Sequence, residues 1–285
     1  MKKNYRYRFG TIEYDLASRT HVMGILNVTP DSFSDGGRYL DTERAIAHGQ
    51  KLEEEGADFI DIGGESTRPG SESVTIEEEI RRVIPVIDAL AKKIHIPISI
   101  DTCKSEVADA ALQAGAALVN DISAMTFDVK MASVAVKNQA SVVLMHMQGT
   151  PKTMQLNPSY RNVTEDVKQY LLERVEAAVN AGINQIIIDP GVGFGKKFEH
   201  NLQLLKELYL LTSLGRPLLV GVSRKSFLGA ILNVPPDDRI EGTAAAVTAS
   251  IMNGANIIRV HDVKEMKRVA LVSDTLKSAL LPEML

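Results

Sequence analysis

Short apolar runs rich in Ile and Val alternate along the chain with longer stretches in which apolar residues recur at helical spacing. Each run ends in a polar residue, and a loop separates it from the helical stretch that follows. Runs without apolar–polar alternation are typical of strands buried on both faces, as in a parallel sheet covered by helices. The eight runs are Val22–Leu26, Phe59–Ile62, Ile96–Ile100, Ala117–Val119, Val142–Met145, Ile186–Ile188, Leu218–Val222 and Ile257–Val260.

The helical stretches turn these runs into eight strand-then-helix units. They cover residues 41–55, 76–93, 105–114, 128–138, 163–181, 198–211, 240–253 and 263–279. Eight such units in 285 residues predict an α/β protein built as one (β/α)8 TIM barrel, a fold of roughly 250 residues. No linker or low-complexity segment interrupts the pattern, so we expect a single domain over residues 1–285. A doubly wound open sheet is the alternative arrangement of the same units.

Local signals support these boundaries. The segment from Thr75 to Glu78 has the spacing of a capping box ahead of the second helix. A glycine follows four of the helical stretches, where a left-handed residue ends a helix: Gly56, Gly115, Gly182 and Gly254. Residues 5–16 alternate weakly, so we expect a β-hairpin that plugs the bottom of the barrel within an N-terminal extension over residues 1–20.

Composition excludes several classes of function. The net charge of -4 gives no electrostatic reason to expect a nucleic acid or an anionic membrane as partner. Aromatic residues make up only 5% and Trp is absent, which argues against a base-stacking surface. Residues 1–9 are basic and lack the apolar core of a signal peptide, and no apolar run approaches a membrane span. The single Cys103 excludes an internal disulfide framework, so we expect a reducing cytoplasm. Taken together, these exclusions leave a small molecule as the expected kind of substrate.

The active site of such a barrel lies at the carboxyl ends of its strands. The polar residues that end the apolar runs are Asn27, Asp61 with Glu65, Asp101, Asn120 with Asp121, His146, Asp189, Ser223 with Lys225, and Arg259 with His261. Side chains alternate along a strand, so residues two apart can point to the same side. Arg259 and His261 are spaced in this way, as are Ser223 and Lys225. Adjacent Asn120 and Asp121 face opposite ways, so one should reach the pocket and the other should cap a loop.

These residue types together suit a planar heterocycle that carries a phosphate group. Carboxylates accept from ring N–H and amino groups, an amide does both, Lys donates to a carbonyl, and Arg and His donate to phosphate. Any one of them alone is as readily explained as a loop cap, and Asp61 in particular can be structural. The set contains no Ser–His–Asp arrangement of a hydrolase and no Cys–His metal cluster.

Three loops carry further signals. Residues 29–37 and 63–70 mix Gly, Pro, Ser and charged residues with few apolar anchors, as mobile catalytic loops do, although an exposed turn is the alternative. Residues 189–196 read Asp-Pro-Gly-Val-Gly-Phe-Gly-Lys and fit neither common phosphate-loop motif, so their glycines are expected to permit tight turns beside a ligand.

Two long stretches carry a specific pattern, Gly24-Ile-Leu-Asn-Val-Thr-Pro-Asp-Ser-Phe-Ser-Asp-Gly-Gly37 and Asp61-Ile-Gly-Gly-Glu-Ser-Thr-Arg-Pro-Gly70. They resemble the signatures of bacterial dihydropteroate synthases, a family of pterin-binding TIM barrels. Shorter matches follow in order at residues 99–102, 120–123, 145–151, 189–196, 221–227 and 259–262, so the resemblance covers about residues 20–280.

The resemblance implies a reaction of folate biosynthesis. 6-Hydroxymethyl-7,8-dihydropterin diphosphate would be joined to 4-aminobenzoate, giving 7,8-dihydropteroate and pyrophosphate. It also implies Mg2+ dependence, a homodimer, inhibition by sulfonamides, and an SN1-like course in which pyrophosphate leaves before the aryl amine attacks.

The resemblance assigns residues to each part of the site. Those that match the pterin pocket are Asp101, Asn120, Met145, Asp189, Phe194, Gly221, Lys225 and Arg259. Those that match the diphosphate site are Asn27, Arg259 and His261, with Asn27 the expected Mg2+ ligand. Those that match the aminobenzoate site are Phe33, Thr67, Arg68, Pro69 and Ser226. The residues expected to support the reaction itself are Asp101, Lys225, Arg259, His261, Asp35 and Arg68.

Two other functions fit the same barrel. A pterin-binding methyltransferase domain would bind methyltetrahydrofolate and pass a methyl group to a corrinoid partner. A non-catalytic pterin-binding paralogue would keep the pocket without turnover. The two long signature loops and the stretch from Ser223 to Ser226 favour the synthase over both.

Overall fold

The computed structural model describes residues 5–29, 38–66 and 70–278, with backbone only for residues 38–40. Eight parallel strands form one sheet in the order β8-β7-β6-β5-β4-β3-β10-β9. A parallel bridge between Ile188 and Leu218 joins the two edges of this sheet, so the barrel is nearly closed. The strands are β3 (His21–Asn27), β4 (Phe59–Gly63), β5 (Ile98–Asp101), β6 (Leu118–Asp121), β7 (Ser141–Met145), β8 (Ile186–Asp189), β9 (Leu219–Val220) and β10 (Ile257–Val260).

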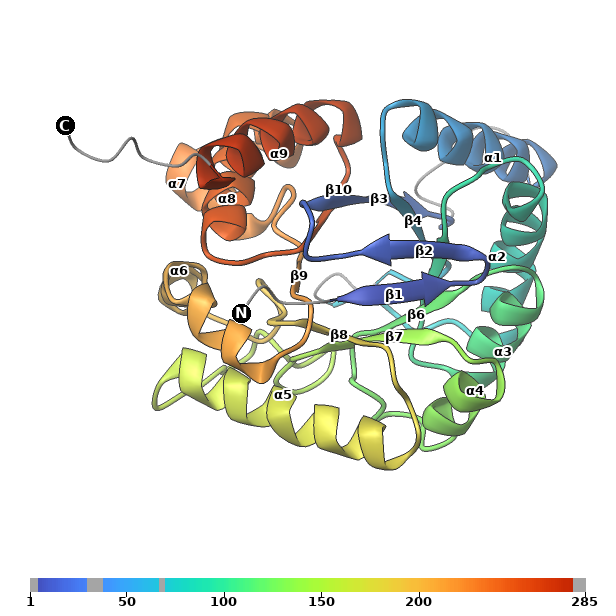
Figure 1. Ribbon diagram of the computed structural model, residues 1–285, viewed down its shortest axis with the longest axis horizontal. Coiled ribbons are helices and arrows are strands. Elements are labelled where there is room, and N and C mark those ends of the chain that lie inside the picture. Colours follow the sequence, from blue (N-terminus) through green and yellow to red (C-terminus); the bar gives the residue numbers. More distant parts are fainter. Residues whose placement is uncertain (1–4, 30–37, 67–69, 279–285) are drawn as a thin grey trace.

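Helices surround this barrel (Figure 1), which confirms the predicted (β/α)8 fold. The α-helices are α1 (Arg38–Glu54), α2 (Ile76–Ala91), α3 (Ser105–Gln113), α4 (Met131–Lys137), α5 (Val163–Asn180), α6 (Phe198–Lys206), α7 (Ser226–Leu232), α8 (Ile240–Met252) and α9 (Val263–Ser278). Two 3-10 helices, η2 (Leu208–Leu214) and η3 (Pro236–Asp238), complete the described elements. No helix within the described ranges is both long and apolar enough to cross a membrane.

Three elements differ from the expectation. The stretch 198–211 divides into α6 and η2, where Leu208 and Leu211 are both buried. Three residues per turn place these two leucines on the same face, which suits a 3-10 helix. The strand expected over residues 218–222 is only Leu219–Val220. Helix α7 was not predicted, and a Cβ at its Gly229 would collide with the Arg239 guanidinium, so close packing on Arg239 defines this short helix.

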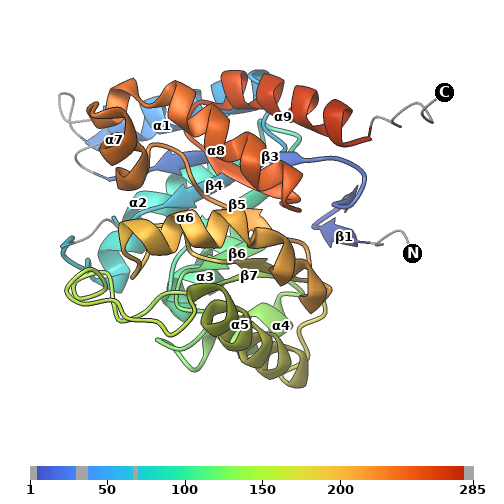
Figure 2. The same cartoon turned by 90° about the vertical axis from the view of Figure 1, so that its left-hand side faces the viewer.

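The N-terminal hairpin plugs one end of the barrel, as predicted. β1 (Arg6–Phe9) pairs antiparallel with β2 (Ile12–Asp15), and the hairpin lies across the barrel in Figure 1 and at its right-hand end in Figure 2. Phe9 meets Phe59 of β4 edge to face at 4.9 Å between ring centroids. The Tyr7 hydroxyl donates to the carbonyl oxygen of Ile186 at 3.0 Å. The hairpin therefore closes the end of the barrel formed by the amino ends of the strands. The end formed by the carboxyl ends of the strands stays open for an active site.

The predicted helix ends are also confirmed in part. Thr75 caps α2, because its hydroxyl accepts from the Glu78 N–H at 3.2 Å. The reciprocal half of the box does not form, since the Glu78 carboxylate pairs with Arg82 at 2.8 Å instead. The four glycines predicted to end helices have φ between 98° and 117°. Such left-handed angles suit glycine.

Candidate active site

The strand ends opposite the hairpin bring the predicted polar residues together. Pairing of β5 with β6 places Asp101 beside Asn120, and pairing of β7 with β8 places Met145 beside Asp189. The loop after β7, yellow-green in Figure 2, projects at this end of the barrel. Asp101, Asn120, Met145 and Asp189 are all buried, so the barrel itself fixes their positions.

Arg259 of β10 lies at the centre of this cluster. Its Nε donates to Asp61 Oδ2 at 2.6 Å, and its Nη2 donates to Asp101 Oδ2 at 2.8 Å. Burial opposes the charge of Arg259, but the two carboxylates raise its pKa further above its ordinary value. Burial also raises the pKa of Asp101, and Arg259 opposes that rise. The guanidinium is therefore a fixed positive charge held between two buried acids.

Asp61 has a structural role that the sequence left open. Its Oδ2 also accepts from Asn120 Nδ2 at 2.9 Å, and its side chain is fully buried. Because a carboxylate only accepts, this bond fixes the amide of Asn120 with its carbonyl oxygen free for a ligand. Asp121 instead accepts from the N–H groups of Ser123 and Met125, at 2.8 and 2.9 Å, and caps the following loop. Asp121 therefore caps the loop, whereas the Asn120 amide joins the polar cluster at the strand ends.

Asp189 begins the glycine-rich loop. Its Oδ1 accepts from the Gly191 N–H at 2.7 Å, and burial raises the pKa of Asp189 to about 6. A Cβ on Gly191, which has a φ of +65°, would collide with the carbonyl oxygen of His146. Gly195 approaches the Gln148 backbone in the same way. The glycines are therefore required by close contact with the loop after β7.

A buried lysine that the sequence analysis did not single out holds this loop. Lys196 Nζ donates to the carbonyl oxygens of Gly191 and Phe194, at 2.8 and 3.0 Å, and lies 2.9 Å from His146 Nδ1. Burial lowers the pKa of Lys196 to about 7 and that of His146 to about 2. The His146 ring also packs edge to face on Tyr170 at 5.0 Å. His146 is therefore a neutral acceptor for Lys196, which in turn holds the glycine-rich loop.

Lys225 enters the cluster from the turn that follows β9. Its ammonium lies 4.2 Å from the centroid of the Phe194 ring, a cation–π distance. Burial lowers the pKa of Lys225 to about 8. Arg239 Nη1 holds the turn through the carbonyl oxygens of Arg224 and Lys225, at 2.9 and 3.3 Å. Because β9 ends at Val220, this turn rather than strand alternation directs the lysine.

Ser223 and His261 meet at the edge of the cluster. The Ser223 Oγ lies 3.0 Å from His261 Nδ1 and accepts from the His261 backbone N–H at 3.2 Å. With that acceptance made, the hydroxyl proton is free to go to Nδ1, which leaves Nε2 as the protonated ring nitrogen. Burial, with Arg259 and Arg224 nearby, lowers the pKa of His261 to about 4. His261 is therefore a neutral donor at pH 7.

Apolar side chains line the mouth beside the acids. Met145 packs with Ile122, Met147 and Met154, and Phe194 and Cys103 pack against this group. Burial raises the pKa of the Cys103 thiol, which makes it a packed thiol and a poor nucleophile. Gly221 follows β9, and a Cβ there would lie 3.9 Å from Arg259 Cβ. A flat apolar ligand face therefore has sulfur and aromatic contacts available beside the polar groups.

The residues suit a magnesium ion that is held mainly by a substrate. Within the described ranges, no group of three or more His, Cys, Asp or Glu side chains could hold a metal ion. Asn27 ends β3 at the same end of the barrel and offers a partly exposed amide oxygen. Mg2+ prefers oxygen ligands and often combines one or two protein groups with phosphates and water. The amide oxygen of Asn27 together with the oxygens of a diphosphate would form a ligand set of this kind.

Five predicted site residues lie outside the described part of the chain: Phe33, Asp35, Thr67, Arg68 and Pro69. Ser226 is described and begins α7, directly after Lys225. Sequence reasoning also missed Lys104 and Glu79, which contact each other at 2.6 Å. A signal for Glu79 existed, because it occupies the buried face of α2 in series with Val83, Ile87 and Leu90.

Comparison with known proteins agrees with this arrangement. The family described as pterin binding enzymes matches residues 23–261. A dihydropteroate synthase of Synechocystis is 48% identical over 94% of this chain and 93% of that protein. A dihydropteroate synthase of Yersinia pestis in complex with a sulfonamide drug superposes with a TM-score of 0.91 at 46% identity, covering 96% of this chain and all of that one.

A Xanthomonas albilineans dihydropteroate synthase determined with 4-aminobenzoic acid also superposes with a TM-score of 0.91. It is 43% identical and covers 97% of this chain and 100% of its own. The superposition therefore extends over nearly the whole of this chain. The chain belongs to the family of pterin binding enzymes and, within it, to the dihydropteroate synthases, which are transferases.

Proposed function

We propose that this chain joins 6-hydroxymethyl-7,8-dihydropterin diphosphate to 4-aminobenzoate, releasing pyrophosphate and forming 7,8-dihydropteroate. The observation that carries the proposal is the polar cluster at the strand ends. Two buried carboxylates and an oriented amide share it with a partly exposed arginine and lysine. The pterin pocket is the set Asp101, Asn120, Met145, Asp189, Phe194, Gly221, Lys225 and Arg259.

Each polar group of the pterin pocket has a partner on a pterin ring. The carboxylates of Asp101 and Asp189 accept from ring N–H and amino groups. Asn120 presents its carbonyl oxygen because Asp61 takes one of its N–H groups. The Lys225 ammonium donates to the pterin carbonyl. Apolar contact from Met145 and Phe194 then favours a flat ring over a flexible substrate.

The diphosphate is assigned to Asn27, Arg259 and His261. Arg259 carries a permanent charge, and neutral His261 donates through Nε2. We propose Mg2+ as the cofactor, with Asn27 as its protein ligand; when bound, it offsets charge on the diphosphate oxygens. Arg259 and His261 stabilise the same charge as it grows on the leaving group.

The reaction follows an SN1-like course. The bond between the pterin methylene carbon and the diphosphate oxygen breaks, and its electron pair leaves with pyrophosphate. The electron-rich pterin shares the resulting positive charge, which Asp101 and Asp189 offset from the ring edge. The nitrogen lone pair of 4-aminobenzoate then forms the new C–N bond, and the nitrogen releases a proton to water. Because an aryl amine is neutral at pH 7, this attack needs no general base.

We assign 4-aminobenzoate to Phe33, Thr67, Arg68, Pro69 and Ser226, and give Asp35 and Arg68 a part in completing the site. Ser226 supports the assignment from the described residues, because it lies one position after Lys225. The Xanthomonas albilineans relative was determined with 4-aminobenzoic acid. An Arg68→Ala variant should keep pterin affinity and lose aminobenzoate use, whereas normal kinetics would remove Arg68 from that site.

We propose a homodimer that covers an apolar face on the outer helices. Leu271, Val272 and Leu276 of α9 are each at least 59% exposed, and Ile231 of α7 is 55% exposed. A cavity of about 380 Å3 between α6, α7 and α8 lies on the outside of the barrel, away from the strand ends. Exposed apolar residues on outer helices are common in protein interfaces, which supports the proposal.

We also propose that residues 1–285 form one domain and that the protein is located in the cytoplasm.

One assay tests the proposed function. The protein is incubated with pterin diphosphate, 4-aminobenzoate and Mg2+, and pyrophosphate and dihydropteroate are measured together. Formation of both in equal amounts is the expected result. Pterin binding without either product would favour a non-catalytic paralogue. Methyl transfer from methyltetrahydrofolate to a corrinoid protein, without condensation, would favour the methyltransferase.

A further inference from the structure

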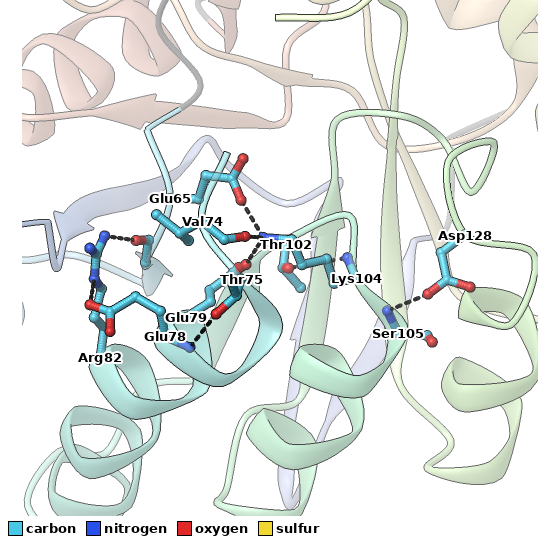
Figure 3. A network of polar contacts seen from close by, with 11 residues as sticks. Glu65, Val74, Thr75, Glu78, Glu79, Arg82, Thr102, Lys104, Ser105 and Asp128 are labelled. Carbon is cyan, nitrogen blue, oxygen red and sulfur yellow. Dashed lines mark hydrogen bonds and ion pairs between the residues drawn. The ribbon is translucent and has the colours of Figure 1, made fainter. Parts of the chain in front are cut away.

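A second polar network joins the loops after β4 and β5 to helix α2 (Figure 3). At its centre, Lys104 Nζ donates to Glu79 Oε2 at 2.6 Å and to the carbonyl oxygen of Val74 at 2.8 Å. The same ammonium donates to Glu65 Oε2. Figure 3 shows all three acceptors converging on this one group, Glu65 and Val74 from the loop after β4 and Glu79 from helix α2. The network lies beside the pterin pocket, because Lys104 follows Asp101 by three residues.

The fixed member of this network is Glu79. It is 1% exposed on the inner face of α2, and its Oε1 has no hydrogen-bond partner among the described residues. A buried carboxylate is strongly unfavourable without a paired cation, so Glu79 holds Lys104 in place. Burial opposes the charge of Lys104, but hydrogen bonds to Glu65 and Glu79 raise its pKa. Lys104 is therefore charged and anchored at neutral pH.

The other two acceptors flank the residues assigned to 4-aminobenzoate. Glu65 precedes and Val74 follows residues 66–73, which we call the aminobenzoate segment. One ammonium therefore binds the chain on both sides of this segment. Arg82 Nη1 adds a third tie, because it donates to the carbonyl oxygen of Gly64 at 2.8 Å. Bringing both ends of a segment to one point removes much of its conformational freedom before a ligand binds.

We propose that Lys104 is a positioning residue for the aminobenzoate half of the reaction. It fixes where the aminobenzoate segment leaves and rejoins the barrel, and it does so by holding Glu65 and Val74 on buried Glu79. The inference rests on the proposed function, in which that segment binds 4-aminobenzoate. Lys104 itself does not touch the reacting groups.

The proposal predicts a split between the two substrates. Without the anchor, Glu65 and Val74 lose their common tie, and fixing their positions again when 4-aminobenzoate binds weakens binding. The polar groups of the pterin pocket are held by bonds that do not involve Lys104, since Arg259 donates to Asp101 and Asn120 donates to Asp61, so the affinity for pterin diphosphate should stay the same. A merely structural role for Lys104 would instead weaken both substrates together as stability falls.

The test uses a pair of changes that keeps the charge balance. Lys104→Met alone would leave Glu79 buried and unpaired, so the main variant is Lys104→Met combined with Glu79→Gln. Lys104→Arg is the conservative replacement that should restore function in part. Lys137→Met is the matched control, because Lys137 also pairs with a carboxylate, Asp109 at 3.0 Å, on the exposed side of the protein.

Three measurements are made on each variant. Steady-state kinetics should show the KM for 4-aminobenzoate raised about tenfold in the double variant, as displaced binding groups do. The calorimetric Kd for pterin diphosphate should stay within about twofold, as for independent sites. Hydrogen–deuterium exchange should become faster in peptides covering residues 64–74, and Lys137→Met should change none of these quantities.

The outcomes separate this proposal from the proposed function. Unchanged exchange in residues 64–74 would overturn the anchor, whether or not the protein condenses the two substrates. Faster exchange with an unchanged KM for 4-aminobenzoate would overturn the positioning role. A parallel loss of both substrates' affinities would do the same. Failure of the unmodified protein to form dihydropteroate would overturn the proposed function and leave the exchange result to judge the anchor.

Discussion

Arg259 Nε donates to Asp61 Oδ2 at 2.6 Å across the mouth of the barrel, joining the last strand to the second parallel strand. Asp61 is fully buried and also accepts from Asn120, so one carboxylate sets the position of two residues of the pterin pocket. Neither residue can be understood alone. The Arg259 guanidinium, which we assign to the diphosphate, is positioned by Asp61, a residue that contacts no substrate in our assignment.

Replacing Asp61 by Asn should therefore weaken both the fold and the pocket. A hydrogen bond to a charged group contributes about 1.5–3 kcal/mol, so we expect a loss of about 2 kcal/mol in the free energy of unfolding. Urea unfolding measures it, and calorimetry should show weaker pterin diphosphate binding. Asp88→Asn is the control, since Asp88 pairs with Lys92 on the surface. Equal stabilities for the two variants would contradict the buried role of Asp61.

Pterin affinity should be greatest between about pH 7 and 8, because burial raises the pKa of Asp101 to about 7 and this carboxylate must also be ionised to accept from the ring. Burial raises the pKa of Asp189 to about 6, so below that value the carboxyl takes up a proton and can no longer accept two N–H groups. Burial lowers the pKa of Lys225 to about 8, so above that value it loses its charge. Affinity should thus fall by up to about tenfold per pH unit beyond either limit. Calorimetry from pH 5 to 9 checks this, and Lys225→Arg should remove the alkaline fall. A flat profile would refute it.

Ser223→Ala should slow the reaction without weakening pterin binding. The hydroxyl contacts both His261 Nδ1 and the His261 backbone N–H, so its loss frees the ring to exchange tautomers. We expect kcat to fall about tenfold, less than the factor of about 100 or more for a positioned acid–base group. Nitrogen NMR of the His261 ring reports the tautomer directly, and Ser223→Thr should restore both readouts. A ring signal that does not change in the alanine variant would disprove this positioning.

Asp58 should stabilise the base of the barrel in a pH-dependent way. It accepts from Arg19, Lys267 and the Val22 N–H at 2.7 to 2.9 Å. Although burial opposes it, these bonds lower the pKa of Asp58. A lowered folded pKa means stability that is present above the unfolded pKa of about 4 and lost as pH falls through the folded pKa.

Asp58→Asn should accordingly lower the free energy of unfolding by about 2 kcal/mol at pH 7. The difference from the unmodified protein should shrink below pH of about 4, as both side chains become neutral. Denaturant unfolding at several pH values measures it. The exposed pair of Asp109 and Lys137 offers the control, because Asp109→Asn should change stability by less than about 1 kcal/mol. A difference that persists unchanged in acid would argue against the ion pairs.

The barrel could be predicted because each unit repeats one pattern. Strands such as β7 (Ser141–Met145) are buried on both faces, and so β7 appears in the sequence as the unbroken apolar run Val142–Met145. Helix α7 could not be predicted, since it has seven residues and depends on Arg239 packing against Gly229. A segment so short carries no periodic signal of its own.

The site was predictable where the strands dictate it and hidden where contacts are long-range. Asp101 and Asn120 follow from strand ends alone. Lys104 meets Glu79 and Glu65 across 25 and 39 residues of chain, and no local pattern records such a meeting. The sequence showed Lys196 only as the last residue of a glycine-rich loop. In the structure its ammonium holds that loop by donating to the carbonyl oxygen of Gly191.

The most direct test of the pterin pocket is a calorimetric titration of pterin diphosphate into the unmodified protein and into Lys225→Ala. Loss of a charged hydrogen bond from a buried site should weaken binding by about 100-fold. Lys264→Ala is the control, because Lys264 is an exposed lysine three residues after His261. This variant should bind pterin diphosphate with the affinity of the unmodified protein. Equal affinity in the Lys225→Ala variant and the unmodified protein would contradict the assignment of the pterin to this cluster.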